Sequence, residues 1–177
     1  MVFSHRLAQF DDLPALNALM TRSIEHLQHG FLSPEQVRAS HQVMGLDTQL
    51  VTDQTYFLIE CDGYLVGCGG WSWRATLFGG DDSIVAREPA PLDPATDAAK
   101  IRAMYVDPDY ARRGIGTMIM TLCEGAAHDA GFAKVEMMAT LAGVPLYRVC
   151  GYSEIEAVEA TTREGVVVPL IRMGKAL

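Results

Sequence analysis

Apolar side chains recur along the chain at two different spacings, and these spacings predict helices and strands in alternation. Between residues 13 and 27, leucines and a methionine stand three or four positions apart, the spacing of one helix face. Ser33-Pro34 is a typical start of a second helix, because serine caps free N–H groups and proline suits the first turn. Two further helices are predicted over 114–130 and 143–150, and Gly131 and Gly151 directly follow them.

Strands are predicted where short apolar runs are bounded by turn residues. Asp62-Gly63 separates two such runs, and Asp-Gly between apolar segments is a strong signal for a β-hairpin. Glycines 67, 69 and 70 in the second run indicate a bulge or a close approach by another element. The predicted strands cover 2–8, 55–61, 64–73, 100–106, 134–139, 153–160 and 165–173. Residues 76–99, with three prolines and a Gly-Gly pair, are expected to form a long loop.

Length and composition narrow the class of protein. A chain of 177 residues with 49% hydrophobic residues suits a single domain, residues 1–177, with a sizeable core. A formal net charge of -8 argues against general binding of nucleic acid or of anionic membranes. No apolar run is long enough to span a bilayer, and the N-terminus lacks the pattern of a signal peptide. The four cysteines lie in apolar segments and are expected to be small core residues of a cytoplasmic protein.

The segment between strand 100–106 and helix 114–130 is the strongest candidate for a ligand site. It reads Asp107-Pro108-Asp109-Tyr110-Ala111-Arg112-Arg113-Gly114-Ile115-Gly116-Thr117. Glycines allow close approach of a ligand, and the start of a helix offers unpaired N–H groups and partial positive charge. Two arginines add full charges at the same place. On an acidic protein, this combination predicts a local site for a phosphate or pyrophosphate.

Three phosphate-binding motifs compete for this segment. A P-loop requires a lysine between its last glycine and the Ser/Thr, but Thr117 follows Gly116 directly. A dinucleotide fingerprint requires Gly or Ala where Ile119 stands, and it begins immediately after a strand, whereas Pro108 intervenes here. Glu136 does lie about twenty residues beyond the glycines, where a ribose-binding acid is expected. That match does not outweigh the two misfits, and a coenzyme A site remains as the third motif.

The segment resembles motif A of the GNAT superfamily of N-acetyltransferases, Gln/Arg-x-x-Gly-x-Gly/Ala. Gly114 and Gly116 match its glycines, Arg112 and Arg113 fill the middle positions, and Ala111 departs from the polar lead residue. A second match lies downstream, where the family has Phe/Leu-Tyr-x-x-x-Gly-Phe/Tyr. Here the sequence reads Leu146-Tyr147-Arg148-Val149-Cys150-Gly151-Tyr152. The resemblance covers roughly residues 55 to 152.

The resemblance implies a fold and a cosubstrate. The expected fold is α/β: a GNAT-like mixed, mostly antiparallel sheet of six to seven strands, helices on both faces, and a splayed central strand pair. The cosubstrate would be acetyl-CoA, with no metal. Backbone N–H groups of the loop Arg112–Thr117, including Gly114, Ile115 and Gly116, would hold the pyrophosphate. The pantetheine arm would pair with the splayed strand at Met104, Tyr105 and Val106, and Thr140 stands where a cofactor-contacting Asn is often found.

The resemblance also suggests catalytic groups. The N–H of Val106 would donate to the thioester carbonyl oxygen. Tyr147 is the candidate acid, because a tyrosine, with a pKa of about 10, stays protonated at neutral pH and can protonate a departing thiolate. Glu136 is the candidate general base, one residue from the place where some members have a catalytic Glu, and such an offset turns a strand side chain to the opposite face. Trp71 and Trp73 would either line an acceptor cleft or pack in the core.

The expected function is transfer of an acetyl group from acetyl-CoA to a primary amine of a small molecule or peptide, by direct attack on the thioester. Neither nucleic acid nor membrane is an expected partner, and a homodimer is compatible with these expectations. Two alternatives stay open. One is transfer of a longer acyl group, and the other is a catalytically idle module that binds coenzyme A as a sensor.

Overall fold

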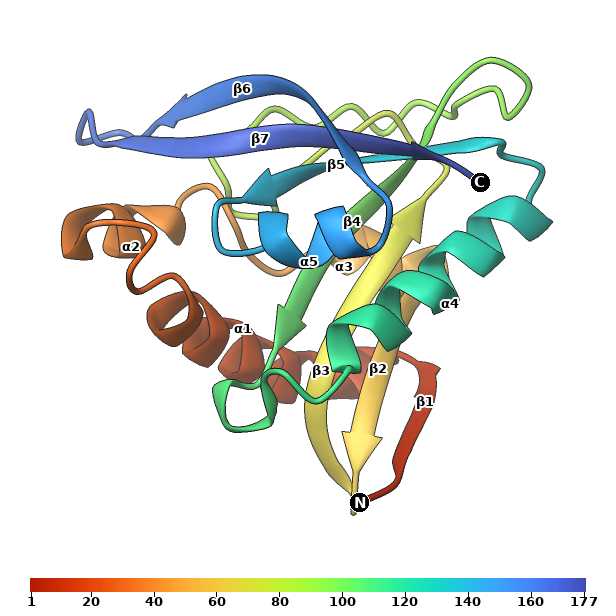
Figure 1. The fold of residues 1–177 in the computed structure, drawn as a ribbon, viewed down its shortest axis with the longest axis horizontal. Helices are drawn as coiled ribbons and strands as arrows, with labels where there is room; N and C mark the ends of the chain where they lie inside the picture. The colour runs from red at the N-terminus through yellow and green to blue at the C-terminus, as the bar shows by residue number, and fades with distance from the viewer.

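The computed structural model describes residues 1–177, which form a seven-stranded sheet with helices on both faces (Figure 1). The strands are β1 (Phe3–Leu7), β2 (Tyr56–Cys61), β3 (Tyr64–Ser72), β4 (Ala99–Val106), β5 (Lys134–Thr140), β6 (Ser153–Thr161) and β7 (Val167–Ala176). The helices are α1 (Leu13–Leu27), α2 (Pro34–Ser40), α3 (Thr48–Thr52), α4 (Ile115–Asp129) and α5 (Val144–Val149). Two short 3-10 turns cover Phe10–Asp12 and Pro108–Tyr110. No helix combines the length and the apolar character that crossing a membrane requires.

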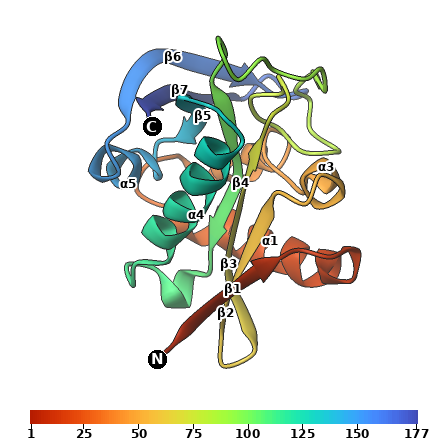
Figure 2. The ribbon, with the colours of Figure 1, turned by 90° about the vertical axis from the view of Figure 1, so that its right-hand side faces the viewer.

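The strand order is β1-β2-β3-β4-β5-β7-β6, and every neighbouring pair is antiparallel except β4 and β5. This confirms the mixed, mostly antiparallel sheet. Figure 2 shows α4 and α5 on one side of the sheet and α1 and α3 on the other. Each side has its own core, because apolar residues of α4 pack on one face of the central strands and those of α1 pack on the other.

The sheet opens between its two central strands. β4 and β5 pair only at Ala99–Val135 and Lys100–Glu136. Beyond these two pairs the strands diverge, as their ribbons show in Figure 1. The remaining length of both strands, from Ile101 and Met137 onwards, lines a cavity of about 710 Å³. The expected splayed strand pair is therefore confirmed.

A β-bulge lies in β4 beside this opening. Cys68 faces Tyr105, but Gly70 faces Arg102, so two residues of β4 stand opposite Gly69. Ala103 within the bulge has a φ of 50°, in the left-handed region. A methyl group at position 69 would lie 2.3 Å from Ile119 Cγ2 on α4, so only glycine allows this close packing of helix on strand. The glycine-rich run thus marks both a bulge and a close approach.

Two features differ from the sequence expectations. Helix α3 was not predicted, because its five residues are too few to display a helical period. Three of the four free cysteines are buried, as expected, but Cys150 is half-buried at the end of α5. Its neighbour Val149 is among the most exposed apolar residues. The last turn of this short helix therefore has one side facing solvent.

Candidate active site

The cavity in the opening of the sheet reaches both faces of the molecule. On one side its wall comes from the start of α4 and from α5; we call this the α4 side. On the other side the wall comes from α1, from residues 43–45 and from residues 77–79; we call this the α1 side. Strands β4 and β5 supply the wall between the two sides. A ligand in this cavity would therefore contact both halves of the sheet.

The α4 side offers an uncapped helix N-terminus. Helix α4 begins after Gly114, which has a φ of 85° and provides no side-chain cap. The first N–H groups of a helix have no partner within it, so those of Ile115, Gly116 and Thr117 are free to bind an anion. Arg112 lines the cavity beside them, but the Arg113 guanidinium lies 5.3 Å from the centre of the Tyr110 ring and is not part of the wall. The structure thus brings one of the two arginines to the cavity.

The end of β4 lines the cavity through Met104, Tyr105 and Val106, as the sequence predicts. The N–H of Asp107 donates to the carbonyl oxygen of Val66 on the β3 side (2.9 Å). Successive N–H groups along a strand point to opposite sides. The N–H of Val106 therefore points away from β3, toward the opening.

Tyr147 lies on α5 and faces the same part of the cavity. Its hydroxyl group is 3.7 Å from the sulfur atom of Met104. Burial raises the pKa of Tyr147 well above that of an exposed tyrosine, so the hydroxyl keeps its proton. The ring has room because residue 143 is glycine: a methyl group there would lie 2.6 Å from Tyr147 Cε2. Thr140 also lines the cavity, and its Oγ1 accepts a hydrogen bond from the Gly143 N–H (3.2 Å).

Glu136 is not part of the cavity wall, which corrects the expectation that it acts there as a general base. Its carboxylate accepts hydrogen bonds from Lys100 Nζ and from Arg172 Nη2, the latter at 2.7 Å. Burial opposes ionisation, but these two partners prevail and lower the pKa of Glu136. Because Lys100 and Glu136 are also register partners, the ion pair fastens β4 to β5 at their short junction. The physical reason is its place along the strand: Glu136 belongs to the last β4–β5 pair, before the strands diverge, whereas Met137 and Met138 beyond it line the cavity.

The tryptophans also lie away from the cavity. Trp71 is buried in the core on the α4 face, where its ring meets that of Phe132 edge to face. Trp73 packs against the same core. Arg74 is ion-paired with Asp53 (2.7 Å). Of the two options that the sequence left open for the tryptophans, core packing is therefore the one adopted.

The charged residues on the cavity wall are Arg102 and Arg112, and no carboxylate lines it. Sequence reasoning did not single out Arg102, which lies in β4 and is only 5% exposed. The sequence does indicate that Arg102 has an ion-pair partner, because a charged residue inside a predicted buried strand requires one. That partner comes from a loop 55 residues earlier, so its identity could not be predicted from local pattern.

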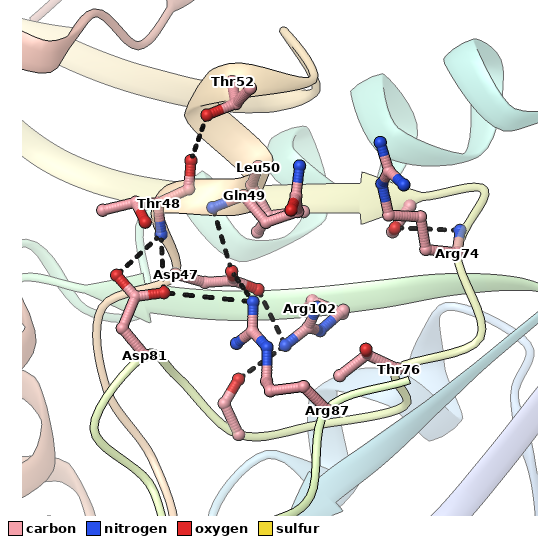
Figure 3. Close-up of polar contacts among 12 residues, drawn as sticks. Asp47, Thr48, Gln49, Leu50, Thr52, Arg74, Thr76, Asp81, Arg87 and Arg102 are labelled. Atoms are coloured by element: carbon pink, nitrogen blue, oxygen red, sulfur yellow. Dashed lines mark hydrogen bonds and ion pairs between the residues drawn. The ribbon is translucent and has the colours of Figure 1, made fainter. Parts of the chain in front are cut away.

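Asp47 is the partner, and it forms a buried ionic cluster shown in Figure 3. Its carboxylate is 2.7 Å from Arg102 Nη2 and 2.7 Å from Arg87 Nη2. It also caps α3 by accepting a hydrogen bond from the Gln49 N–H (3.2 Å). Asp81 lies 3.9 Å from Arg87 at the edge of this group. We call Asp47, Arg87 and Arg102 the Asp47 cluster; it ties α3, β4 and the long segment after β3 together.

Comparisons with known proteins agree with this geometry. The model of the acetyltransferase (GNAT) family matches residues 20–152. A GCN5-related N-acetyltransferase from Rhodopseudomonas palustris is 19% identical with a TM-score of 0.73, over 100% of this chain and 99% of that one. The ribosomal-protein-S18-alanine N-acetyltransferase of Escherichia coli is 18% identical with a TM-score of 0.60, over 99% and 94%. The PaiA N-acetyltransferase of Thermoplasma acidophilum, solved with coenzyme A, is 14% identical with a TM-score of 0.62, over 100% of both chains. No curated protein matches the sequence.

At these identities, the solved structures establish a shared fold. The family model goes further, because it covers well over half of the chain, from the middle of α1 to Tyr152, three residues after α5. It includes the splayed strands, the uncapped start of α4 and Tyr147. The chain therefore belongs to the GNAT acetyltransferase family.

Proposed function

We propose that this protein transfers the acetyl group of acetyl-CoA to a primary amine of a small molecule or peptide. One observation carries the proposal: the uncapped N-terminus of α4, the end of β4 and the buried Tyr147 hydroxyl all face a single cavity. An amine that enters from the α1 side can thus meet a thioester held from the α4 side. The four free thiols suit a reducing compartment such as the cytoplasm.

The chemistry of the wall fits coenzyme A. Arg112 and the free N–H groups at the start of α4 supply positive charge and donors for the pyrophosphate. The pantetheine arm contains amides, and the unpaired edge of β4 can bond to them as it would to an added strand. The N–H of Val106 would donate to the carbonyl oxygen of the thioester and stabilise the negative charge that develops there.

Tyr147 would supply the proton that the reaction needs at sulfur. As the amine nitrogen bonds to the thioester carbon, the carbon–sulfur bond breaks and the electron pair leaves with the sulfur. The raised pKa of Tyr147 keeps its hydroxyl protonated until that moment. The amine must lose a proton as well, and since no carboxylate lines the cavity we assign this step to water. Solvent then returns a proton to the Tyr147 oxygen, so one proton passes from the amine to water and one from water, through the tyrosine, to the thiolate.

The test measures free thiol released from acetyl-CoA with a panel of amines. Tyr147→Phe is expected to lower turnover by roughly a hundredfold while acetyl-CoA binding stays unchanged. Tyr64→Phe is the matched control, because Tyr64 is 71% exposed and outside the cavity wall. Equal turnover by Tyr147→Phe and the wild type would remove the acid role.

Two further outcomes separate the alternatives. A protein that binds acetyl-CoA but releases thiol with no amine is a sensor rather than an enzyme. Faster thiol release from longer acyl-CoA thioesters than from acetyl-CoA would identify a longer acyl group as the one transferred. Under the proposal, acetyl-CoA is the faster donor.

A further inference from the structure

The α1 side of the cavity, where an acceptor would enter, is mostly apolar. Its wall includes apolar side chains from α1, from the connections before and after α2 and from the long segment after β3: Ile24, Leu27, Phe31, Val43, Met44 and Phe78. An apolar wall of this kind favours an acceptor with an apolar body. Any polar group on such a wall is therefore informative about the acceptor.

Arg102 is the charged group on this mostly apolar wall, and some of its hydrogen-bond donors are unused. Its polar contacts come from one nitrogen, Nη2, which forms an ion pair with Asp47 and donates a hydrogen bond to the carbonyl oxygen of Gly79. Its Nε is buried and has no hydrogen-bond partner. A buried donor without a partner is costly, so a ligand that supplies an acceptor atom gains from binding there.

The charge around Arg102 is also incompletely balanced. Its carboxylate partner, Asp47, is shared with Arg87, so two guanidinium groups stand against one buried carboxylate. Asp81 is partly exposed and lies 3.9 Å from Arg87, and its charge influences the pKa of Arg102 less than that of Asp47 does. Burial lowers the pKa of Arg102, and the charge of Asp47 only partly offsets this. A second anion beside Arg102 would complete the balance.

A second residue of the cavity wall, Gln28, also has an unpartnered polar atom. Gln28, at the end of α1, is 3% exposed, and its Oε1 accepts no hydrogen bond. Its Nε2 contacts only the sulfur of Met44 (3.8 Å). The wall thus combines a cationic donor and a neutral acceptor with an apolar surface. Gln28 Oε1 can accept a hydrogen bond from an N–H group of a ligand, and the Arg102 guanidinium can pair with an anionic group.

From this combination we propose that the acceptor is an apolar amino acid, with its carboxylate held by Arg102 and an N–H of its amine accepted by Gln28. This inference rests on the proposed function and narrows its substrate class. Arg102 would act as a specificity-determining residue: it selects amines that carry a carboxylate over amines of the same shape without one.

The test uses matched amines in the thiol-release assay. Leucine, methionine and phenylalanine are each compared with the amine that lacks only the carboxylate, and kcat/KM is measured for both. Because the two members of a pair differ in basicity, the decisive quantity is how their ratio changes between wild type and variant. Arg102→Met is expected to lower the ratio roughly tenfold or more, since a charge-assisted hydrogen bond is lost. Arg102→Lys should retain part of the preference.

Two controls keep the result interpretable. Arg148→Met removes a guanidinium that is 63% exposed and lies outside the cavity wall and the Asp47 cluster, and it should leave the ratio unchanged. Binding of acetyl-CoA reports whether each variant is folded; if Arg102→Met does not fold, Arg102→Lys and the wild-type comparison still decide. Thiol release by the wild type only with amines that lack a carboxylate overturns the inference but leaves the proposed function intact. A ratio that Arg102→Met and Arg102→Lys both leave unchanged also overturns it, and no thiol release with any amine overturns both proposals.

Discussion

Replacing Asp47 with Asn should cost this protein a large part of its stability. Asp47 is fully buried and lies 2.7 Å from two guanidinium groups, one of them the buried Arg102. Asparagine caps a helix about as well as aspartate, so Asp47→Asn keeps the cap of α3 and removes only the negative charge. Breaking a buried ion pair costs about 3–5 kcal/mol, because the remaining charge stays buried without its partner. Typical domains unfold at about 5–15 kcal/mol, so this loss is readily measured.

Urea unfolding would give the free energy of unfolding of wild type and variant, provided that the m-value is the same for both. The double variant Asp47→Asn/Arg102→Met should be more stable than Asp47→Asn alone, because the unpaired buried charge is then gone. Asp109→Asn is the control: Asp109 is also ion-paired, with Arg22, but its side chain is 79% exposed, and the change should stay within about 0.5 kcal/mol. The reasoning fails if Asp47→Asn behaves like the control, or if the double variant is the less stable one.

Three other predictions concern the cavity, the strand junction and the helix packing. Arg112→Ala should weaken acetyl-CoA binding roughly tenfold at low salt and less at high salt, whereas Arg113→Ala should change it little. Calorimetric titration at two salt concentrations measures both dissociation constants, and equal effects of the two variants would contradict this prediction. Glu136 has a lowered pKa, so its ion pairs stabilise the fold above a pH of about 4.3, and this contribution is lost as the pH falls through the lowered value. The stability difference between wild type and Glu136→Gln should therefore shrink in acid, and a difference independent of pH would contradict this. Gly69→Ala should destabilise the protein by about 1–3 kcal/mol through overpacking against α4. Gly125→Ala, on the exposed face of α4 with free space around it, should stabilise the protein by up to about 1 kcal/mol. Melting temperatures that rank the two variants in the reverse order would refute the packing argument.

Local sequence pattern predicted most helices and strands because each carries its own periodicity and its own stop signals. The helix expected over 114–130 is α4, Ile115–Asp129, with Gly131 directly after its cap. Gly116 and Tyr147, which both line the cavity, were expected from short motifs that resemble those of a known family. Their convergence on one cavity follows from the crossing of α4 and α5 over the open sheet.

Features that depend on contacts between distant segments were not predictable in this way. Residues 76–99 read as a loop, and their anchoring by the Asp47 cluster depends on ion pairs across 40 and 55 positions of sequence. Gln28 carries no local signal, since a glutamine near a helix end is ordinarily a surface residue. The position of Glu136 outside the cavity depends on where β4 and β5 diverge, which no local pattern shows.

The short junction between β4 and β5 has a consequence for how the enzyme's stability should be understood. Strands β1–β4 and β5–β7 form two hydrogen-bonded half-sheets, joined along their backbones at two residue pairs. A cosubstrate that hydrogen-bonds to the edge of β4 and packs against β5 would lengthen this junction. It would then stabilise the sheet as well as take part in the reaction. By mass action, bound cosubstrate then raises the free energy of unfolding of the whole protein. In the free protein, the junction between β4 and β5 is where local opening begins.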